Sequence, residues 1–246
     1  MHRPAPRRQA GQATIEYLYV VPILLILLLG SLQFIFIYQA KQTLNYATFY
    51  GARNGALNNG LMASIQDGVV SGLAPMFVHD ETLTALKTAR KLALNELSDK
   101  KLARIEIVNP TASALSEFAN NDGQIPNDNL MYRPTDTGSS GMNVQDANLL
   151  KVRVTYCVRL VVPIVNRMIH AFTVSRPTVP DAIDSSYDGG KIAAADMLKV
   201  TQGTSGNGLC YDPDNQYPYR IPVTSESVVR MQTAFGDPGL WVAPAP

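Results

Sequence analysis

The sequence predicts an α+β fold in which a long N-terminal transmembrane helix packs on a small antiparallel sheet with long loop insertions. An apolar stretch at 18–38 continues into a helical pattern that reaches about residue 58. Residues 150–160 alternate strictly between apolar and polar side chains, which is the period of a strand with one buried face. Segments rich in Gly, Pro, Asn and Ser separate these elements and are typical of loops.

Composition narrows the function classes. The chain has 246 residues and a net charge of +1, so it is long enough for one folded domain beside the apolar stretch and gives no reason to expect a nucleic-acid partner. The catalytic motifs of zinc proteases, α/β-hydrolases, P-loop proteins and dinucleotide-binding enzymes do not occur. The three histidines, His2, His79 and His170, stand apart from one another. We therefore expect a protein that is not an enzyme and that holds no metal or cofactor.

The N-terminus carries the features that most need explanation. Positive charge at Arg3, Arg7 and Arg8 precedes the apolar stretch, and Glu16 is the first acidic residue. The positive-inside rule places this end in the cytoplasm and the chain after residue 38 across the membrane. The apolar stretch can span a hydrocarbon core of about 30 Å. A carboxylate costs about 2–3 kcal/mol where it sits deep in a bilayer, so we expect Glu16 to serve a function.

Other N-terminal signals fit this stretch less well. The apolar region of a cleaved secretory signal is usually about 7–15 residues long and ends at small residues, whereas this one is longer and has no such site directly after it. A lipoprotein signal is excluded because no Cys lies near the junction. A plain signal anchor remains open but leaves Glu16 unexplained.

A class III signal, the substrate of prepilin peptidases, explains that carboxylate. The heptapeptide Gly-Gln-Ala-Thr-Ile-Glu-Tyr at 11–17 before an apolar run resembles such a signal. Pro22, Gly30 and the Ala-Thr-Phe-Tyr-Gly-Ala-Arg-Asn-Gly-Ala segment at 47–56 extend the likeness. Over about residues 7–57 the chain resembles the TadE-like family of minor pseudopilins from tight-adherence (Flp, type IVb) pilus systems.

The resemblance implies two sites in this heptapeptide. Prepilin peptidase would cleave after Gly11 and leave Gln12 as the new N-terminus. Glu16 and Tyr17 would then form an assembly contact, in which Glu16 pairs with the α-amino group of a neighbouring subunit.

The resemblance also implies a domain plan, partners and a location. Residues 1–11 would be the leader peptide, 12–58 the transmembrane and continuing helix, and 59–246 a periplasmic or extracellular pilin-like α+β domain. Partners would be the prepilin peptidase, the inner membrane and other pilins or pseudopilins of the same pilus. The protein would start as a single-pass protein of the bacterial inner membrane, with its N-terminus cytoplasmic, and would act in pilus assembly, initiation and surface adhesion.

Two other functions stay open at this point. The chain could be a signal-anchored periplasmic enzyme or sensor. It could also be a pseudopilin of a type II secretion system, although those usually carry Phe at the first mature position, where this sequence has Gln12.

After the apolar stretch the helix carries small residues that permit a close approach of another backbone. Either the helix packs on its own sheet, which we favour, or it packs on a neighbouring pilin helix. The small residues are Ala47, Gly51, Ala52, Gly55 and Ala56. The Asn58-Asn59-Gly60 sequence is expected to end the helix.

Alternating patterns and breaker residues predict the remaining elements. We expect helices at 61–73, from about Glu81 to Leu97 with Asp80 as N-cap, and at 163–172. Strands are expected at 103–108, 150–160 and 220–231, with Pro110 ending the first. The loop-rich segment 119–148 is expected to be a surface excursion without a second core.

The chain contains two cysteines, Cys157 and Cys210. In an exported domain they can form a disulfide, which would close a loop worth about 4 kcal/mol in the chain-entropy model. Two unrelated thiols are the alternative. Cys157 lies on the polar face of its strand, so only a segment outside the sheet could reach it. The Asp212-Pro-Asp214 sequence lacks the Gly and the distal Glu of an EF-type calcium loop.

Overall fold

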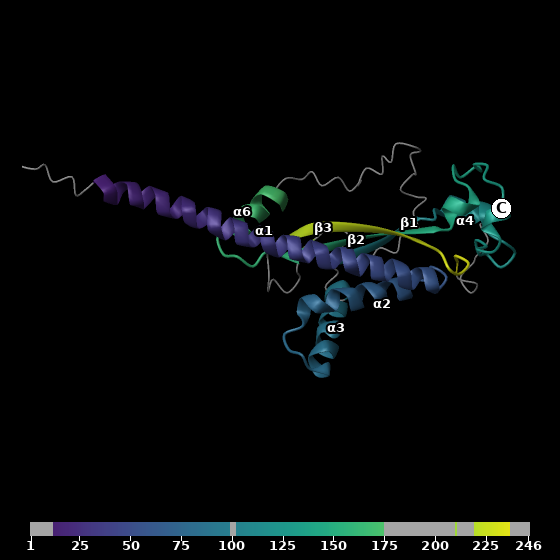
Figure 1. The fold of residues 1–246 in the computed structure, drawn as a ribbon, viewed down its shortest axis with the longest axis horizontal. Coiled ribbons are helices and arrows are strands. Elements are labelled where there is room, and N and C mark those ends of the chain that lie inside the picture. The colour runs from purple at the N-terminus through teal and green to yellow at the C-terminus, as the bar shows by residue number, and fades with distance from the viewer. Residues whose placement is uncertain (1–11, 99–101, 175–209, 211–218, 237–246) are drawn as a thin grey trace, which may run out of the picture.

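The computed structural model describes residues 12–98, 102–174, 210 and 219–236 (Figure 1). Its helices and strands follow the chain in this order: α1 (Gln12–Leu57), α2 (Met62–Leu73), η1 (Ala74–Phe77), α3 (Leu83–Ser98), β1 (Ala103–Asn109), α4 (Ala112–Phe118), η2 (Leu130–Tyr132), α5 (Val144–Ala147), β2 (Leu149–Arg159), α6 (Val165–Val174) and β3 (Arg220–Arg230).

The three strands form one antiparallel sheet in the order β1-β2-β3. Val154, at the middle of β2, pairs with Ile105 of β1 and Ser225 of β3. Its neighbours on the same face, Val152 and Tyr156, are buried with it against the helices. The predicted α+β fold, with a long apolar helix on a small antiparallel sheet, is confirmed.

The C-terminal half of α1 lies along this sheet, whereas its N-terminal half projects beyond it (Figure 1). Contact with the sheet begins near Ala40 and Leu44, which are both buried. Two polar contacts fix α1 to β3. Lys41 Nζ donates a hydrogen bond to the Thr224 carbonyl oxygen, and Ser225 Oγ donates one to Asn45 Oδ1 at 2.8 Å. The helix therefore combines a packed half and a half that the described part of the chain leaves largely exposed.

The small residues of α1 approach mainly α2, in addition to the sheet that we favoured. A Cβ atom added at Gly51 would lie 2.5 Å from Val69 Cγ2, and one added at Gly72 of α2 would lie 2.5 Å from the Cα of Ala47. Gly68 meets Gly51 in the same way, with its added Cβ 2.7 Å from the Gly51 Cα. The close approach is thus to α2 of the same chain, because α2 folds back along α1 with its own glycines facing it. At Gly55 the predicted contact with the sheet also occurs, since an added Cβ would lie 3.0 Å from Leu150 Cδ2 of β2 as well as 2.5 Å from Ile65 Cγ1 of α2. The prediction that these residues pack on the sheet holds at that position and misses the packing on α2.

The end of α1 follows the sequence prediction. Asn59 and Gly60 adopt left-handed backbone conformations with φ of 54° and 72°. The Gly60 N–H donates to the Gly55 carbonyl oxygen at 2.8 Å, which satisfies a carbonyl at the helix end. The chain then reverses into α2.

The start of α3 differs from the predicted cap. The helix begins at Leu83, and the hydroxyl of Thr82 accepts a hydrogen bond from the Ala85 N–H at 3.2 Å. Asp80 instead accepts a hydrogen bond from the adjacent Glu81 N–H, which is a local turn. Thr82 is the N-cap because its hydroxyl stands three residues before a free N–H of the first turn.

Segment 119–148 is more than a surface excursion. Ile125 is fully buried, Leu130 and Val144 are nearly so, and all three belong to the main core. Ile125 also forms a bridge with Phe235, which follows β3. The segment contains no separate core, but it covers the end of the existing one.

Cys157 and Cys210 are joined by a disulfide, with their Cα atoms 5.2 Å apart. Cys157 is fully buried and packs with Cys210 and Leu102 in a small cluster apart from the main core. The bond ties Cys210 to the polar face of β2, as the strand pattern requires.

Candidate functional site: the exposed half of the long helix

The predicted processing site lies at the edge of the structure. Gly11 lies outside the described residues, and Gln12 is the first residue of α1. Glu16 and Tyr17 are exposed in the first turns of the helix, with Tyr17 71% accessible. Within the described ranges no residue covers them. The cleavage and assembly roles of these four residues stay predictions.

The surface around Glu16 is apolar. Large side chains exposed along the first half of α1 are Ile15, Tyr17, Leu18, Tyr19, Val20, Ile23, Leu24, Leu25, Ile26, Leu27, Leu28, Leu32, Phe34, Ile35 and Phe36. Among the residues that the structure describes, α1 is the one helix long and apolar enough to cross a membrane, judged by length and composition. These properties are consistent with single-pass membrane anchoring, because exposed apolar surface of this extent is costly in water.

Besides Glu16 and the tyrosines, the polar side chains of this stretch are Ser31 and Gln33, and each makes a hydrogen bond. Ser31 Oγ donates to the Leu28 carbonyl oxygen of its own helix at 2.8 Å. The Gln33 side-chain oxygen accepts a hydrogen bond from the Val162 N–H at 2.8 Å, and Gln33 is fully buried. Glu16 is the sole charged residue from 15 to 38. The Gln33 side-chain nitrogen is buried and has no hydrogen-bond partner among the described residues. Glu16 is an exposed carboxylate on an apolar stretch, and it calls for a partner from outside the chain.

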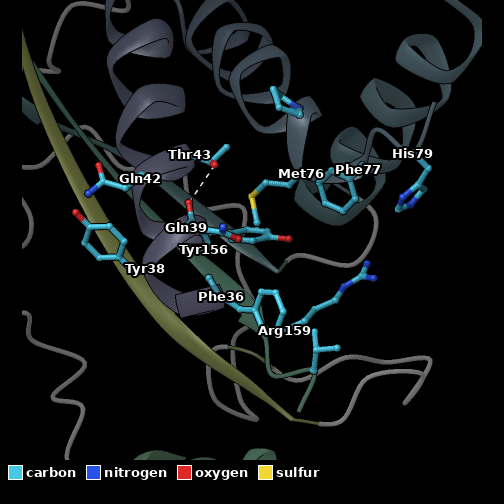
Figure 2. Close-up of a pocket in the computed structure, with 14 residues that line it drawn as sticks. Phe36, Tyr38, Gln39, Gln42, Thr43, Met76, Phe77, His79, Tyr156 and Arg159 are labelled. Carbon is cyan, nitrogen blue, oxygen red and sulfur yellow. Dashed lines mark hydrogen bonds between the residues drawn. The ribbon is translucent and has the colours of Figure 1, made fainter. Parts of the chain in front are cut away.

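A cavity of about 730 Å³ lies where α1 leaves the apolar stretch (Figure 2). It lies between α1, η1 and the end of β2, and its wall is largely apolar. Its lining residues are Phe36, Tyr38, Gln39, Ala40, Gln42, Thr43, Pro75, Met76, Phe77, His79, Tyr156, Val158, Arg159 and Val161.

The polar groups of this cavity do not form a catalytic arrangement. Figure 2 shows His79 and Arg159 on one side, away from Tyr38 and Gln42. The Arg159 guanidinium lies 5.8 Å from the centroid of the Phe77 ring, which it covers. No group of three or more metal-binding side chains occurs within the described ranges.

A buried ionic cluster stands behind the cavity. The Glu96 carboxylate of α3 accepts hydrogen bonds from the Tyr156 hydroxyl, from Arg159, and from Arg220 at 3.3 Å. Arg220 is fully buried and also donates to the Cys157 carbonyl oxygen at 3.0 Å. Burial, and then the negative charge of Glu96, raises the pKa of Tyr156 far above its usual range.

This cluster holds α3 against β2 and β3. Buried charges are tolerated where each has partners of opposite charge or hydrogen bonds, and these do. No local sequence pattern predicts this cluster, because Glu96 lies 63 residues from Arg159 and 124 from Arg220. Its two arginines and its glutamate resemble ordinary surface charges when they are read in sequence.

The remaining histidines lie apart. His79 follows η1 at the rim of the cavity, and the His170 ring on α6 makes an edge contact with Tyr219, with centroids 5.4 Å apart. His2 and the Asp212-Pro-Asp214 sequence lie outside the described residues.

One comparison with known proteins agrees with the site. The family model described as TadE-like protein matches residues 11–53, which contain the predicted processing site and most of α1. The resemblance to that family is thereby confirmed over this range, and it associates the chain with the tight-adherence (Tad) pilus. No curated protein and no solved structure matches the chain.

Proposed function

We propose that this chain is a minor pseudopilin of a tight-adherence pilus that acts in pilus assembly or initiation and in surface adhesion. It would be inserted in the bacterial inner membrane with its N-terminus cytoplasmic and its folded domain periplasmic. Prepilin peptidase would remove residues 1–11. The protein would work by packing and binding, not as an enzyme.

The observation that carries this proposal is the setting of Glu16. It is an exposed carboxylate at the start of the stretch 15–38, which has no other charged residue, inside the segment that matches the TadE-like model. A carboxylate in the hydrocarbon region costs about 2.5–3.5 kcal/mol without a partner. Cleavage after Gly11 would create a positively charged α-amino group close to the same depth on each subunit. A pair between Glu16 of one subunit and the amine of the next would offset that cost only in the assembled state.

The first experiment tests processing. The full chain is coexpressed with the prepilin peptidase of its own system, and the N-terminus is determined by mass spectrometry. We expect a mature chain that starts at Gln12, and an uncut chain for Gly11→Leu. Gly30→Ala serves as the matched control, because that glycine lies deep in the same helix with no atom within 4 Å of an added Cβ. A leader that stays intact, or a start at another residue, would contradict the proposal.

The second experiment tests assembly. We expect Glu16→Ala to be cleaved normally but to enter pili much less than the unchanged chain, as measured by immunoblotting of sheared pili. Ser31→Ala is the control, since it removes a polar group that bonds only within its own helix. Normal incorporation of the Glu16→Ala chain would refute the role of this carboxylate.

A further inference from the structure

Helix α6 carries an exposed apolar stripe. Met168 and Phe172 of α6 are 42% and 73% exposed, and Ile164, in the turn directly before the helix, is 60% exposed; these three residues form the stripe. The spacing of four residues places Met168 and Phe172 on one side of α6. Val165 lies on the same side in the first turn and is buried where α6 packs against α1 and β3. The described chain thus covers the apolar side of α6 at its first turn and leaves it exposed from Met168 onward.

The attachment of this segment to α1 fixes its depth. The turn before α6 is held by the hydrogen bond from the Val162 N–H to Gln33. Gln33 lies fifteen residues after Leu18, which corresponds to about 22 Å along a helix and falls inside a hydrocarbon core of about 30 Å. Figure 1 shows α6 beside the part of α1 that extends beyond the sheet.

The neighbouring surface of α1 is of the same kind. Phe34 and Ile35, directly after Gln33, are 65% and 52% exposed. Val161, which precedes the turn, is 67% exposed. The apolar stripe of α6 therefore continues a surface that the anchoring role of α1 already assigns to lipid.

We propose that α6 is an interfacial helix that lies in the leaflet farther from the N-terminus, with Ile164, Met168 and Phe172 inserted among the lipid acyl chains. Such helices combine a short apolar face with a polar face at the headgroup level. Arg167 is exposed on the other side of α6 and would face the headgroups.

The bilayer is favoured over a second protein chain by continuity and depth. A protein partner would have to enter the leaflet farther from the N-terminus in order to contact the stripe. Lipid already surrounds α1 at that level. A second attachment of this kind would restrict rotation and tilt of the folded domain relative to the membrane. The inference rests on the membrane insertion of α1 alone and not on pilus assembly.

The test uses the full chain with single added cysteines at Phe172→Cys, Arg167→Cys and Met131→Cys. The native cysteines are bonded to each other and do not compete for the label. Met131 is 83% exposed in η2, well away from α6. Each protein is labelled with an environment-sensitive dye and reconstituted in phosphatidylethanolamine–phosphatidylglycerol vesicles that contain doxyl-labelled lipid or are treated with aqueous iodide.

We expect doxyl lipid to quench the dye at position 172 and iodide not to quench it. Its emission maximum should lie at a shorter wavelength than that of the dye at position 131, which stays in water. Dyes at 167 and 131 should be quenched by iodide. Iodide quenching at 172 equal to that at 131 would overturn the proposal. Protection at 172 from both quenchers would also overturn it, because a protein would then cover the stripe.

Vesicle flotation separates this inference from the proposed function. A chain that floats with vesicles but leaves position 172 in water refutes only the interfacial helix. A chain that does not float refutes the membrane anchor, and the inference fails with it. A chain that passes both tests but is not cleaved after Gly11 supports the interfacial helix and refutes the proposed function.

Discussion

Replacing Gly72 by Ala tests the close packing of α1 on α2. An added Cβ at this position would lie 2.5 Å from the Cα of Ala47 and 2.9 Å from its Cβ. Carbon atoms in contact normally stay about 3.5–4.0 Å apart. The nearest atom belongs to the backbone, so no side-chain rotation can relieve the overlap. The two helices would have to separate by about 1 Å to restore ordinary contacts.

Two effects of opposite sign determine the free energy of unfolding. Overpacking of a well-packed core costs about 1–3 kcal/mol. Alanine gains up to about 1 kcal/mol over glycine in a helix interior, and less here because Gly72 is next to the last residue of α2. The expected net loss is about 1–2 kcal/mol, which lowers the unfolding temperature by about 3–6 °C in a chain of this size.

The measurement is thermal unfolding of the full chain in detergent micelles, followed by far-UV circular dichroism. Gly68→Ala should behave like Gly72→Ala, because its added Cβ would lie 2.7 Å from the Cα of Gly51. Gly30→Ala is the matched control and should leave the transition unchanged or slightly higher, since it meets no atom within 4 Å. If Gly72→Ala instead raised the unfolding temperature, helix propensity would be the larger effect and the close approach would be refuted.

Two further predictions concern charged groups. Glu96→Ala should lower the free energy of unfolding by about 3 kcal/mol or more, because it removes the carboxylate that balances two buried or half-buried arginines. Denaturant titration measures this loss. The control Asp67→Ala breaks an exposed ion pair and should lower the free energy of unfolding by less than about 0.5 kcal/mol. A comparable loss from both would show that the burial of the Glu96 cluster is unimportant. Hydrogen bonds from Ser140, and then from Ser139, lower the pKa of Glu117 below its ordinary value of 4.5. A lowered pKa gives a stabilisation that is complete above the unfolded value and lost as the pH falls through the folded one. We therefore expect amide exchange at 138–141, corrected for its intrinsic pH dependence, to accelerate in the unchanged chain as the pH falls below the ordinary glutamate value of 4.5. A Glu117→Gln chain should show no such step.

The sequence predicted the elements whose signal is local. The span at 18–38, the alternation at 150–160 and the Asn58-Asn59-Gly60 stop each depend on neighbouring residues, and the structure has all three elements close to the predicted bounds. The heptapeptide at 11–17 is also a local signal; it indicated the resemblance to the TadE-like family, and the family match covers it. Errors of detail arose where two local options competed, as with Asp80 and Thr82 at the start of α3.

The sequence could not predict which residues far apart in the chain contact one another. Small residues at 47–56 indicated close helix packing, but they could not show that Gly68 and Gly72 supply the opposite surface. In the sequence, Gln33 only interrupts an apolar run, and the tertiary structure alone shows that its side-chain oxygen accepts a hydrogen bond from the Val162 N–H. Glu96 likewise finds Arg220 only after α3 and β3 come together.

The sequence by itself determined that this chain has an apolar N-terminal helix, a lone carboxylate near its start and a small antiparallel sheet, because hydrophobic period and charge are properties of short segments. The tertiary structure decided which half of α1 is packed, how the buried charges are balanced and at what level α6 meets the apolar helix. Those outcomes depend on contacts between distant segments, and no local pattern encodes the partner of a buried group.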